Sequence, residues 1–215
     1  MKKTMNTLLI IIGVALVGWF LYSWIPVLNI EEPNYTLVSE TRDYEIREYR
    51  SYIIAETTIV GAKDRNDAVN KGFPIIAGYI FGDNTKRDKI AMTAPVNTEA
   101  SASEKIAMTV PVNTEQGEGN VYKISFVMPS KYSFETLPEP NDARVELREV
   151  SSRKVAVKRF SWTATESAFQ KYETELLQAL ARDGVETVGA VNVARYNTPW
   201  TIPFMLRSEV QVEVL

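Results

Sequence analysis

The sequence contains neither cysteine nor histidine. Without cysteine, the chain can form no disulfide bond, no thiolate nucleophile and no cysteine-ligated metal site. Without histidine, it lacks the commonest metal ligand and the usual general base near neutral pH, so Ser-His and Cys-His catalysis is excluded. No HExxH, GxSxG, P-loop or GxGxxG pattern occurs either. We therefore expect a protein that is not an enzyme.

Basic residues are too few outside the N-terminus for a nucleic-acid partner. The chain has 24 Lys and Arg against 27 Asp and Glu, and its first 30 residues hold Lys2 and Lys3 but no acid. The remainder carries a net charge of about −5, whereas a protein that neutralises phosphates needs a basic surface. The length of 215 residues allows a membrane anchor and one domain with a substantial core.

A long uncharged segment follows the two lysines. Residues 7–28 carry no charge and would extend about 33 Å as a helix, enough to cross a bilayer. A cleaved signal peptide is the alternative, but its nearest small-residue site, at residues 13–15, follows only a short apolar run. The sequence favours a retained anchor over residues 1–30.

This anchor also predicts an orientation. The two lysines favour a cytoplasmic N-terminus, and Trp19, Tyr22 and Trp24 fit an outer interfacial belt. We therefore expect a single-pass protein of the inner (plasma) membrane, with its domain on the periplasmic or extracellular side. Residues 31–43 are polar and are interpreted as a linker, and residues 44–215 form the domain.

Two internal similarities organise the domain. The segment YEIREYRSYIIAE (44–56) aligns without gaps with VELREVSSRKVAV (145–157), and each is a candidate strand pair that precedes a helical stretch. The segment KIAMTAPVNTE (89–99) recurs as KIAMTVPVNTE (105–115), which indicates a hairpin, although Pro95 and Pro111 favour edge positions or bulges. Further strands are expected over 121–129, 191–197 and 209–215. An α+β domain of two βαββ-type units with antiparallel strands follows.

The two expected helices differ in their apolar faces. The second, over 166–182, has one apolar stripe, as an ordinary amphipathic helix does. The first, over 65–81, has two stripes: Val69, Phe73, Ile76 and Ile80 form one, and Ala68, Gly72, Ile75 and Tyr79 form the other. The second stripe must meet something else: a loop, around 97–104 or 130–143, a protein partner, the membrane or a ligand. A ligand would occupy a hydrophobic cleft with walls at Phe73, Ile76, Ala77 and Tyr79, with Met92 and Met108 as adaptable contributors.

Several longer motifs resemble one family. They are the YEIREY opening, the helix GFPIIAGYIFG, the doubled KIAMT-PV segment, the stretch 126–150 and the tail 196–214. In this order they resemble the SOUL haem-binding protein family over residues 35–215. The resemblance implies a distorted antiparallel β-barrel with two flanking helices, and non-covalent binding of haem or another tetrapyrrole or apolar small molecule along the first helix. The implied ligand-binding residues are Val69, Phe73, Ile76, Ala77, Tyr79, Ile80, Met92 and Met108.

The chain departs from the family pattern at the polar end of this site. Because there is no histidine, iron could be ligated only by Tyr79, by a methionine or not at all. The positions at which the resemblance places an arginine and a lysine are Asn70 and Gly78, so Lys71 or the group Lys86, Arg87 and Lys89 would have to replace them. The alternative function is a scaffold that docks a protein or lipid on the same helix face.

Two other groups of residues are given structural interpretations. Glu45, Arg47 and Glu48 recur as Glu146, Arg148 and Glu149, which indicates a solvent-facing ladder of charge pairs rather than a pair of catalytic carboxylates. The tail around Trp200, Pro203 and Phe204 is interpreted as a plug packed on the barrel, with a partner-docking loop as the alternative.

Overall fold

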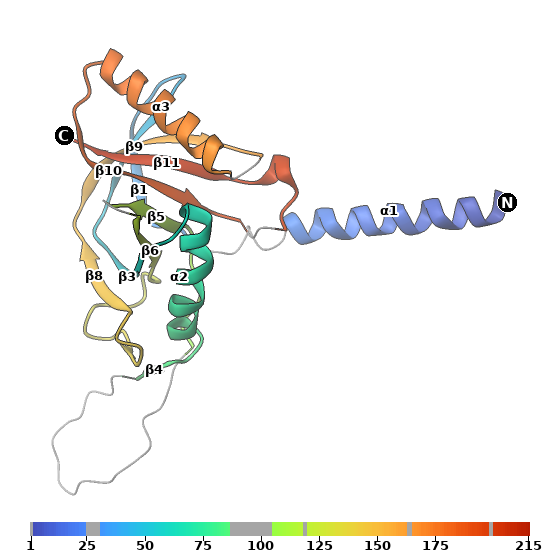
Figure 1. The fold of residues 1–215 in the computed structure, drawn as a ribbon, viewed down its shortest axis with the longest axis horizontal. Coiled ribbons are helices and arrows are strands. Elements are labelled where there is room, and N and C mark those ends of the chain that lie inside the picture. Colours follow the sequence, from blue (N-terminus) through green and yellow to red (C-terminus); the bar gives the residue numbers. More distant parts are fainter. Residues whose placement is uncertain (1, 25–30, 87–104, 118–119, 163–164, 198–199) are drawn as a thin grey trace, which may run out of the picture.

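The computed structural model describes residues 2–24, 31–86, 105–117, 120–162, 165–197 and 200–215. It shows a domain of strands and two helices, from which a further N-terminal helix, α1 (Lys2–Trp24), projects (Figure 1). The helix contains residues 7–24 of the uncharged segment 7–28, and residues 25–28 lie outside the described residues.

The domain contains two similar units, and each has one strand more than the predicted βαββ unit. Each unit has two strands, a helix and two more strands. The first comprises β2 (Glu45–Tyr49), β3 (Tyr52–Val60), α2 (Arg65–Ile80), β5 (Val112–Gln116) and β6 (Val121–Val127). The second comprises β8 (Glu146–Val150), β9 (Arg153–Phe160), α3 (Glu166–Arg182), β10 (Thr187–Arg195) and β11 (Ser208–Val214).

The pairing between the units follows the repeat. Glu45 of β2 pairs with Val157 of β9, and Glu146 of β8 pairs with Glu56 of β3. These two pairs are equivalent when the two units are aligned in sequence. The first strand of each unit therefore pairs with the second strand of the other unit. The N-termini of the two helices also meet, because Arg65 donates from Nη1 to Glu166 Oε1 at 2.7 Å.

All these strands join one antiparallel sheet in the order β1-β2-β9-β11-β10-β5-β6-β3-β8. The nine strands curl into a half-barrel, which confirms the predicted α+β antiparallel architecture in this more open form (Figure 1). The edge strand β1 (Tyr35–Glu40) lies in the segment that we interpreted as a linker. Its six residues are all exposed, so the burial that produces a strand pattern in the sequence is missing there. A separate two-stranded sheet joins β4 (Asn84–Thr85) to β7 (Glu139–Pro140).

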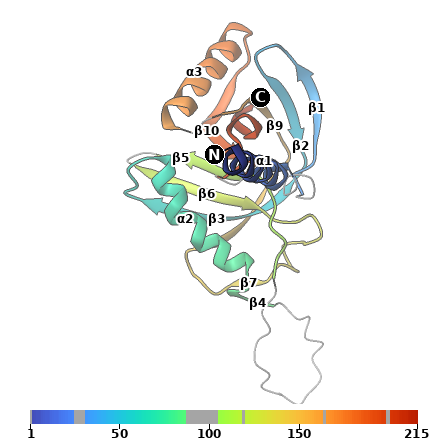
Figure 2. The same ribbon diagram turned by 90° about the vertical axis from the view of Figure 1, so that its right-hand side faces the viewer.

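Both domain helices lie on the same face of the sheet (Figure 2). They begin close to where the sequence predicted, because each has a capping residue: the side chain of Asp64 accepts from the N–H of Asp67, and that of Thr165 accepts from the N–H of Ala168. Helix α2 covers β3 and β6, whereas α3 covers β9, β10 and β11.

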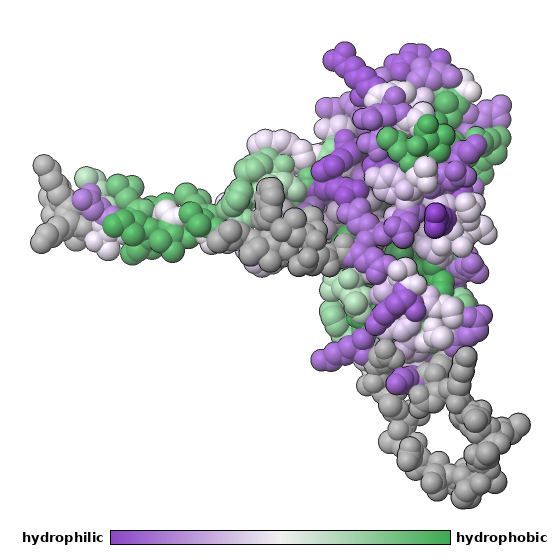
Figure 3. Space-filling model, turned by 180° about the vertical axis from the view of Figure 1, so that it is seen from behind, coloured by the Kyte–Doolittle hydropathy of each residue, from purple (hydrophilic) through white to green (hydrophobic). Residues whose placement is uncertain are grey.

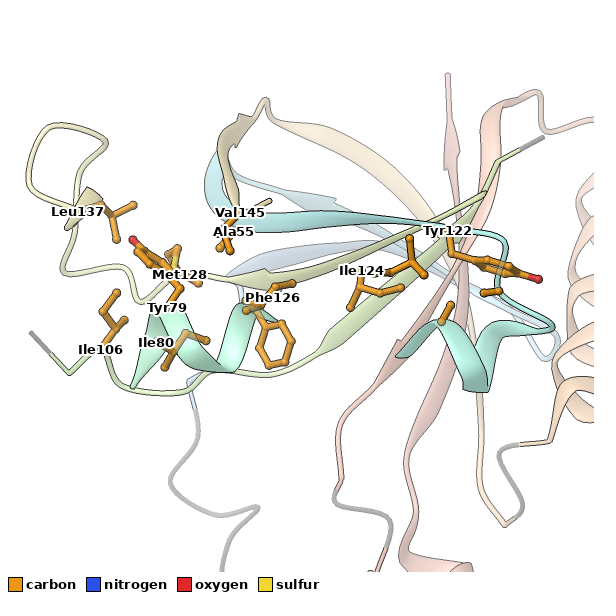
Figure 4. Packing of buried hydrophobic residues seen from close by; sticks show 14 residues of the cluster. Ala55, Tyr79, Ile80, Ile106, Tyr122, Ile124, Phe126, Met128, Leu137 and Val145 are labelled. Carbon is orange, nitrogen blue, oxygen red and sulfur yellow. The ribbon is translucent and has the colours of Figure 1, made fainter. Parts of the chain in front are cut away.

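Each helix closes its own hydrophobic core. Under α2, Ile76, Tyr79 and Ile80 pack with Ile124 and Phe126 of β6 (Figure 4). Under α3, the strand residues that face the helix include Ala156, Val193 and Val210. Because alternate strand residues point to opposite faces, the face of the sheet without helices carries a different set of side chains from the same strands.

The doubled segment gives a shorter strand than expected. The first copy, 89–99, lies outside the described residues, so the predicted hairpin between the copies is untested. In the second copy, regular pairing starts only at Val112, and β5 pairs with β6 and β10. Pro111 has no N–H to donate to a ladder, which accounts for the late start of the strand.

Helix α1 stands away from the domain and presents mostly hydrophobic side chains (Figure 3). Its last turns meet the segment before β11: Trp19 donates from Nε1 to the carbonyl of Trp200 at 2.9 Å, and the hydroxyl of Ser23 accepts from the N–H of Ile202 at 3.1 Å. In the part of the chain that the structure describes, no helix is both long enough and apolar enough to cross a membrane.

Candidate functional site

The inner side of α2 belongs to the core. Ile76, Tyr79 and Ile80, three of the predicted ligand-binding residues, are at most 1% exposed. The phenol of Tyr79 donates to the carbonyl of Pro138 at 2.9 Å. Tyr79 is therefore a buried, hydrogen-bonded core residue, and in this structure its oxygen is not presented to an iron at the surface.

Part of this burial comes from the close packing of α2 against the sheet. Gly72 lies so close to β6 that an added Cβ would stand 2.7 Å from Cγ1 of Ile124. This close approach buries Ala68 and Gly72 of the second predicted stripe under the helix. At the other end of that stripe, Tyr79 is covered by the loop 130–143, because its phenol donates to the carbonyl of Pro138 and it packs in one cluster with Leu137. The sheet and one of the two predicted loops therefore share the cover of this stripe.

The outer side of α2 is the apolar surface that remains. Phe73 is 36% exposed, and its ring centroid lies 5.3 Å from that of Phe126 in a tilted arrangement. Val69 and Ala77, one turn before and after Phe73, are half-buried. Phe81, at the C-cap of the helix, extends this row and is exposed. An open aromatic ring supported by a buried one is the main feature of this face.

A neighbouring segment adds one of the two predicted methionines. The chain passes the C-terminal end of α2 at Ile106, whose N–H donates to the carbonyl of Ile80 at 2.8 Å, and then reaches β5. Met108, between these points, is 40% exposed. Met92 lies outside the described residues. The structure therefore leaves four of the eight predicted residues partly exposed on or beside α2: Val69, Phe73, Ala77 and Met108.

Few charges accompany this face. Lys71 is engaged with Asp67 at 2.7 Å, and its hydrogen bond holds the pKa of Asp67 below its usual value. Asn70 is exposed and Gly78 is half-buried, and neither can supply a cation. Lys86 is exposed after the helix, whereas residues 87 and 89 lie outside the described part. Among the residues that the structure places, no group of three His, Cys, Asp or Glu could hold a metal ion.

Comparison with known sequences identifies the family of this chain. The family model "SOUL heme-binding protein" matches residues 30–213. The chain belongs to the SOUL family. A human protein, "Heme-binding protein 2", is 29% identical over 157 residues, which cover 73% of this chain and 71% of the human protein. The family is one of binding proteins, which agrees with the lack of catalytic motifs in this SOUL chain.

Solved structures share the fold at low identity. The C-terminal domain of EcmrR is similar with a TM-score of 0.56 and 10% identity, covering 84% of this chain and 98% of that one. A hydrolase from Listeria innocua gives a TM-score of 0.51 at 9% identity, covering 83% and 94%. These likenesses concern the fold alone and bring no activity to the SOUL chain.

The opposite face of the sheet carries a polar network that the sequence analysis missed. Arg47 was expected to face solvent, but its side chain is only 3% exposed and lies 3.0 Å from the fully buried carboxylate of Glu209. Its equivalent, Arg148, is half-exposed and holds Glu56 with bonds of 2.9 and 3.0 Å. The available signal was the alternation of SEVQVEV over 208–214, in which Glu209, Gln211 and Glu213 share one face.

Proposed function

We propose that this SOUL-family chain binds haem or another tetrapyrrole, without a covalent bond, against the outer face of α2. The supporting observation is Phe73, a solvent-open ring that packs on Phe126, with Val69 and Ala77 beside it. A flat macrocycle needs a broad apolar contact, and an exposed aromatic ring offers a stacking surface at little cost in conformational entropy. Met108 supplies an adaptable side chain on the neighbouring segment.

The mode of binding follows from the iron-ligating side chains that the chain lacks. It has no histidine, and the phenol of Tyr79 is engaged in the core. Apolar contact with the ring, rather than a bond to iron, then supplies most of the binding free energy. We therefore expect metal-free protoporphyrin to bind within about threefold of the affinity of haem, because losing the iron removes no strong protein ligand.

A porphyrin titration of the full-length chain in mild detergent tests the proposal. Saturable changes in the Soret absorption are expected with both haem and protoporphyrin. Phe73→Asp should abolish them, because a carboxylate at this position would be desolvated under the macrocycle. An unchanged spectrum at micromolar ligand, measured against the detergent alone, would contradict the proposal.

A matched variant separates loss of the site from loss of the fold. Phe134 is 39% exposed, close to the value for Phe73, but it lies in the loop after β6 rather than on α2. Phe134→Asp should leave the porphyrin titration unchanged. Both variants should keep the far-UV circular dichroism of the native chain, and equal loss of binding in both would show that α2 is not the site.

We also propose that the N-terminal end of the molecule contacts membrane lipid, with the chain at the inner membrane and the domain on its outer side. The support is a group of exposed aromatic residues where α1 meets the domain. Trp162 and Trp200 are 61% and 76% exposed, and the ring of Phe204 lies 6.4 Å from that of Trp162. Trp19 of α1 is hydrogen-bonded to the carbonyl of Trp200. Exposed indoles suit the interface between lipid and water.

Flotation with phosphatidylcholine vesicles tests this second proposal. The full-length chain should float with the vesicles, and Trp162→Ser combined with Trp200→Ser should reduce the bound fraction. In cells, protease added from outside the inner membrane should digest the domain. A chain that stays at the bottom of the gradient, or a domain protected by an intact inner membrane, would contradict it.

A further inference from the structure

A cavity lies on the sheet face that carries no helix. It has a volume of about 200 Å³ and is lined by residues of β3, β5, β6, β8, β9, β10 and β11, so both repeats contribute to it. On β6, Ile124 and Phe126 face α2, whereas Lys123 and Ser125, which alternate with them, face the cavity. The cavity is therefore separated from the outer face of α2 by the sheet itself.

An irregularity of β10 shapes one wall of this cavity. The pairing of β10 with β11 shifts register between Val188 and Asn192. Gly189, within the shift, has a φ of +73° and lines the cavity, and nothing stands within 4 Å of where its Cβ would be. A bulge with a left-handed glycine leaves open space at the sheet surface, and such bulges are common beside functional sites.

The charged groups of the cavity are balanced. Three acids, Glu56, Glu115 and Glu213, line it together with Lys123, Arg148 and Arg153. Two of the possible pairs are formed within the protein: Arg148 binds Glu56 at 2.9 Å, and Arg153 lies 3.2 Å from Glu213. These four groups need no charged ligand.

The remaining two groups form no hydrogen bond or salt bridge among the described residues; Lys123 and Glu115 act only through their charges, on Glu56 and Arg148. Glu115 of β5 and Lys123 of β6 are cross-strand neighbours in the ladder, and both are exposed toward the cavity. Neither makes a hydrogen bond or an ion pair with a side chain that the structure places. A carboxylate and an ammonium that are not held in a salt bridge thus stand side by side at the edge of one cavity.

Neutral polar groups continue from this pair across the sheet. The amide of Asn192 donates to Asn113 at 3.1 Å and approaches Gln211 at 3.4 Å. All three residues line the cavity, as does the hydroxyl-bearing Ser125. The floor therefore offers both donors and acceptors to a polar guest.

We propose that this cavity binds a small zwitterion of the α-amino-acid class, with its carboxylate at Lys123 and its ammonium at Glu115. A ligand with one charge would leave one of the two groups unmatched, whereas a zwitterion satisfies both. Sites for drug-sized molecules measure about 300–1,000 Å³, so a cavity of 200 Å³ suits a smaller guest than a tetrapyrrole. The proposal is independent of the proposed tetrapyrrole function, because the two sites lie on opposite sides of the sheet.

Calorimetric titration of the full-length chain with each proteinogenic amino acid tests the proposal. At least one should bind saturably, and its N-acetyl and methyl-ester derivatives, which carry only one charge, should each bind at least tenfold more weakly. Lys123→Met and Glu115→Gln should each weaken binding by about tenfold, because each removes one charge-assisted contact.

The chain provides a matched control. Glu48 of β2 and Lys154 of β9 are also an exposed cross-strand pair of the same residue types, but they do not line the cavity. Glu48→Gln and Lys154→Met should leave amino-acid binding unchanged, and all four variants should melt within a few degrees of the native chain. Failure of every amino acid to bind at millimolar concentration overturns the proposal, and so does binding that survives Lys123→Met and Glu115→Gln.

The two proposed sites can fail separately. Lys123→Met and Glu115→Gln should leave the porphyrin titration unchanged, and Phe73→Asp should leave the amino-acid titration unchanged. Amino-acid binding with no porphyrin binding would refute only the function assigned to α2. Porphyrin that competes with the amino acid would show that the cavity is the tetrapyrrole site, and would overturn the zwitterion proposal.

Discussion

Glu209 is fully buried in β11, yet its pKa is lowered. Burial by itself would raise that pKa, but the facing guanidinium groups of Arg47 and Arg207 outweigh the desolvation. Hydrogen bonds from the hydroxyl of Tyr196 at 2.8 Å and the amide of Gln211 at 2.9 Å stabilise the carboxylate further. At the scale of single residues, stability thus depends on a charged cluster that spans β2 and β11.

Removing one member of this charged cluster should destabilise the folded chain. Arg47→Met should lower the free energy of unfolding by about 3–5 kcal/mol, because it leaves a buried carboxylate with one cation fewer. Arg42→Met is the control: Arg42 is exposed, and the change should stay within about 0.5 kcal/mol. Urea denaturation measures both values. Similar midpoints for the two variants would show that Arg207 alone compensates Glu209.

The same cluster predicts acid sensitivity. Because the pKa of Glu209 is lower in the folded chain than its usual value of 4.5, the unfolded chain binds more protons below that pH. The stabilisation is complete above about pH 4.5 and is lost as the pH falls through the folded pKa. Glu209→Gln should lower the melting temperature at pH 7 and flatten its fall between about pH 5 and 3. Glu48→Gln, at an exposed site, should keep the native slope.

At the scale of elements, the seating of α2 on the sheet decides which of its side chains are available. The predicted helix, its two apolar stripes and the repeat of the strands could all be derived from the sequence, because each has a period. Which of the two stripes belongs to the core could not be derived from the sequence. Gly72 allows close contact with Ile124 of a distant strand, and two segments that are also distant in the sequence, at Ile106 and Leu137, complete the core around the end of the helix.

The other differences between prediction and structure also arise because burial depends on contacts between residues that are distant in the sequence. Arg47 alternates with apolar residues as an exposed strand residue would, but the sheet curls so that its side chain meets Glu209, which lies far away in the sequence. Strand β1 escaped prediction because both of its faces are exposed, which leaves no alternation to detect. Local patterns therefore predict elements, whereas the burial of polar residues depends on long-range pairing.

Two glycines of α2 allow a test of its seating. Gly72→Ala should destabilise the domain by about 1–3 kcal/mol, because its Cβ would stand 2.7 Å from Cγ1 and 3.1 Å from Cβ of the buried Ile124. Gly78→Ala should instead stabilise it by about 0.5–1 kcal/mol, since its nearest neighbour would be 4.0 Å away and alanine favours a helix. Chemical denaturation checks both changes. Stabilisation by both substitutions would show that α2 lies farther from β6.

At the scale of the whole molecule, the domain closes its two cores without α1. The core clusters under α2 and α3 contain no residue of α1, and the contacts between α1 and the domain include the hydrogen bonds of Trp19 and Ser23. The apolar side chains of α1 are mostly exposed, so the helix adds little burial to the domain and much surface that water solvates poorly.

A chain that starts at residue 31 should therefore fold. Loss of the two hydrogen bonds removes about 1–3 kcal/mol, which corresponds to a melting temperature lower by about 3–10 °C for a domain of this size. The shortened chain should melt cooperatively and stay in solution without detergent, because the exposed apolar surface of α1 is gone. Circular dichroism melting of both chains measures the difference. A shortened chain without a cooperative transition would show that α1 is part of the folded domain rather than an attachment to it.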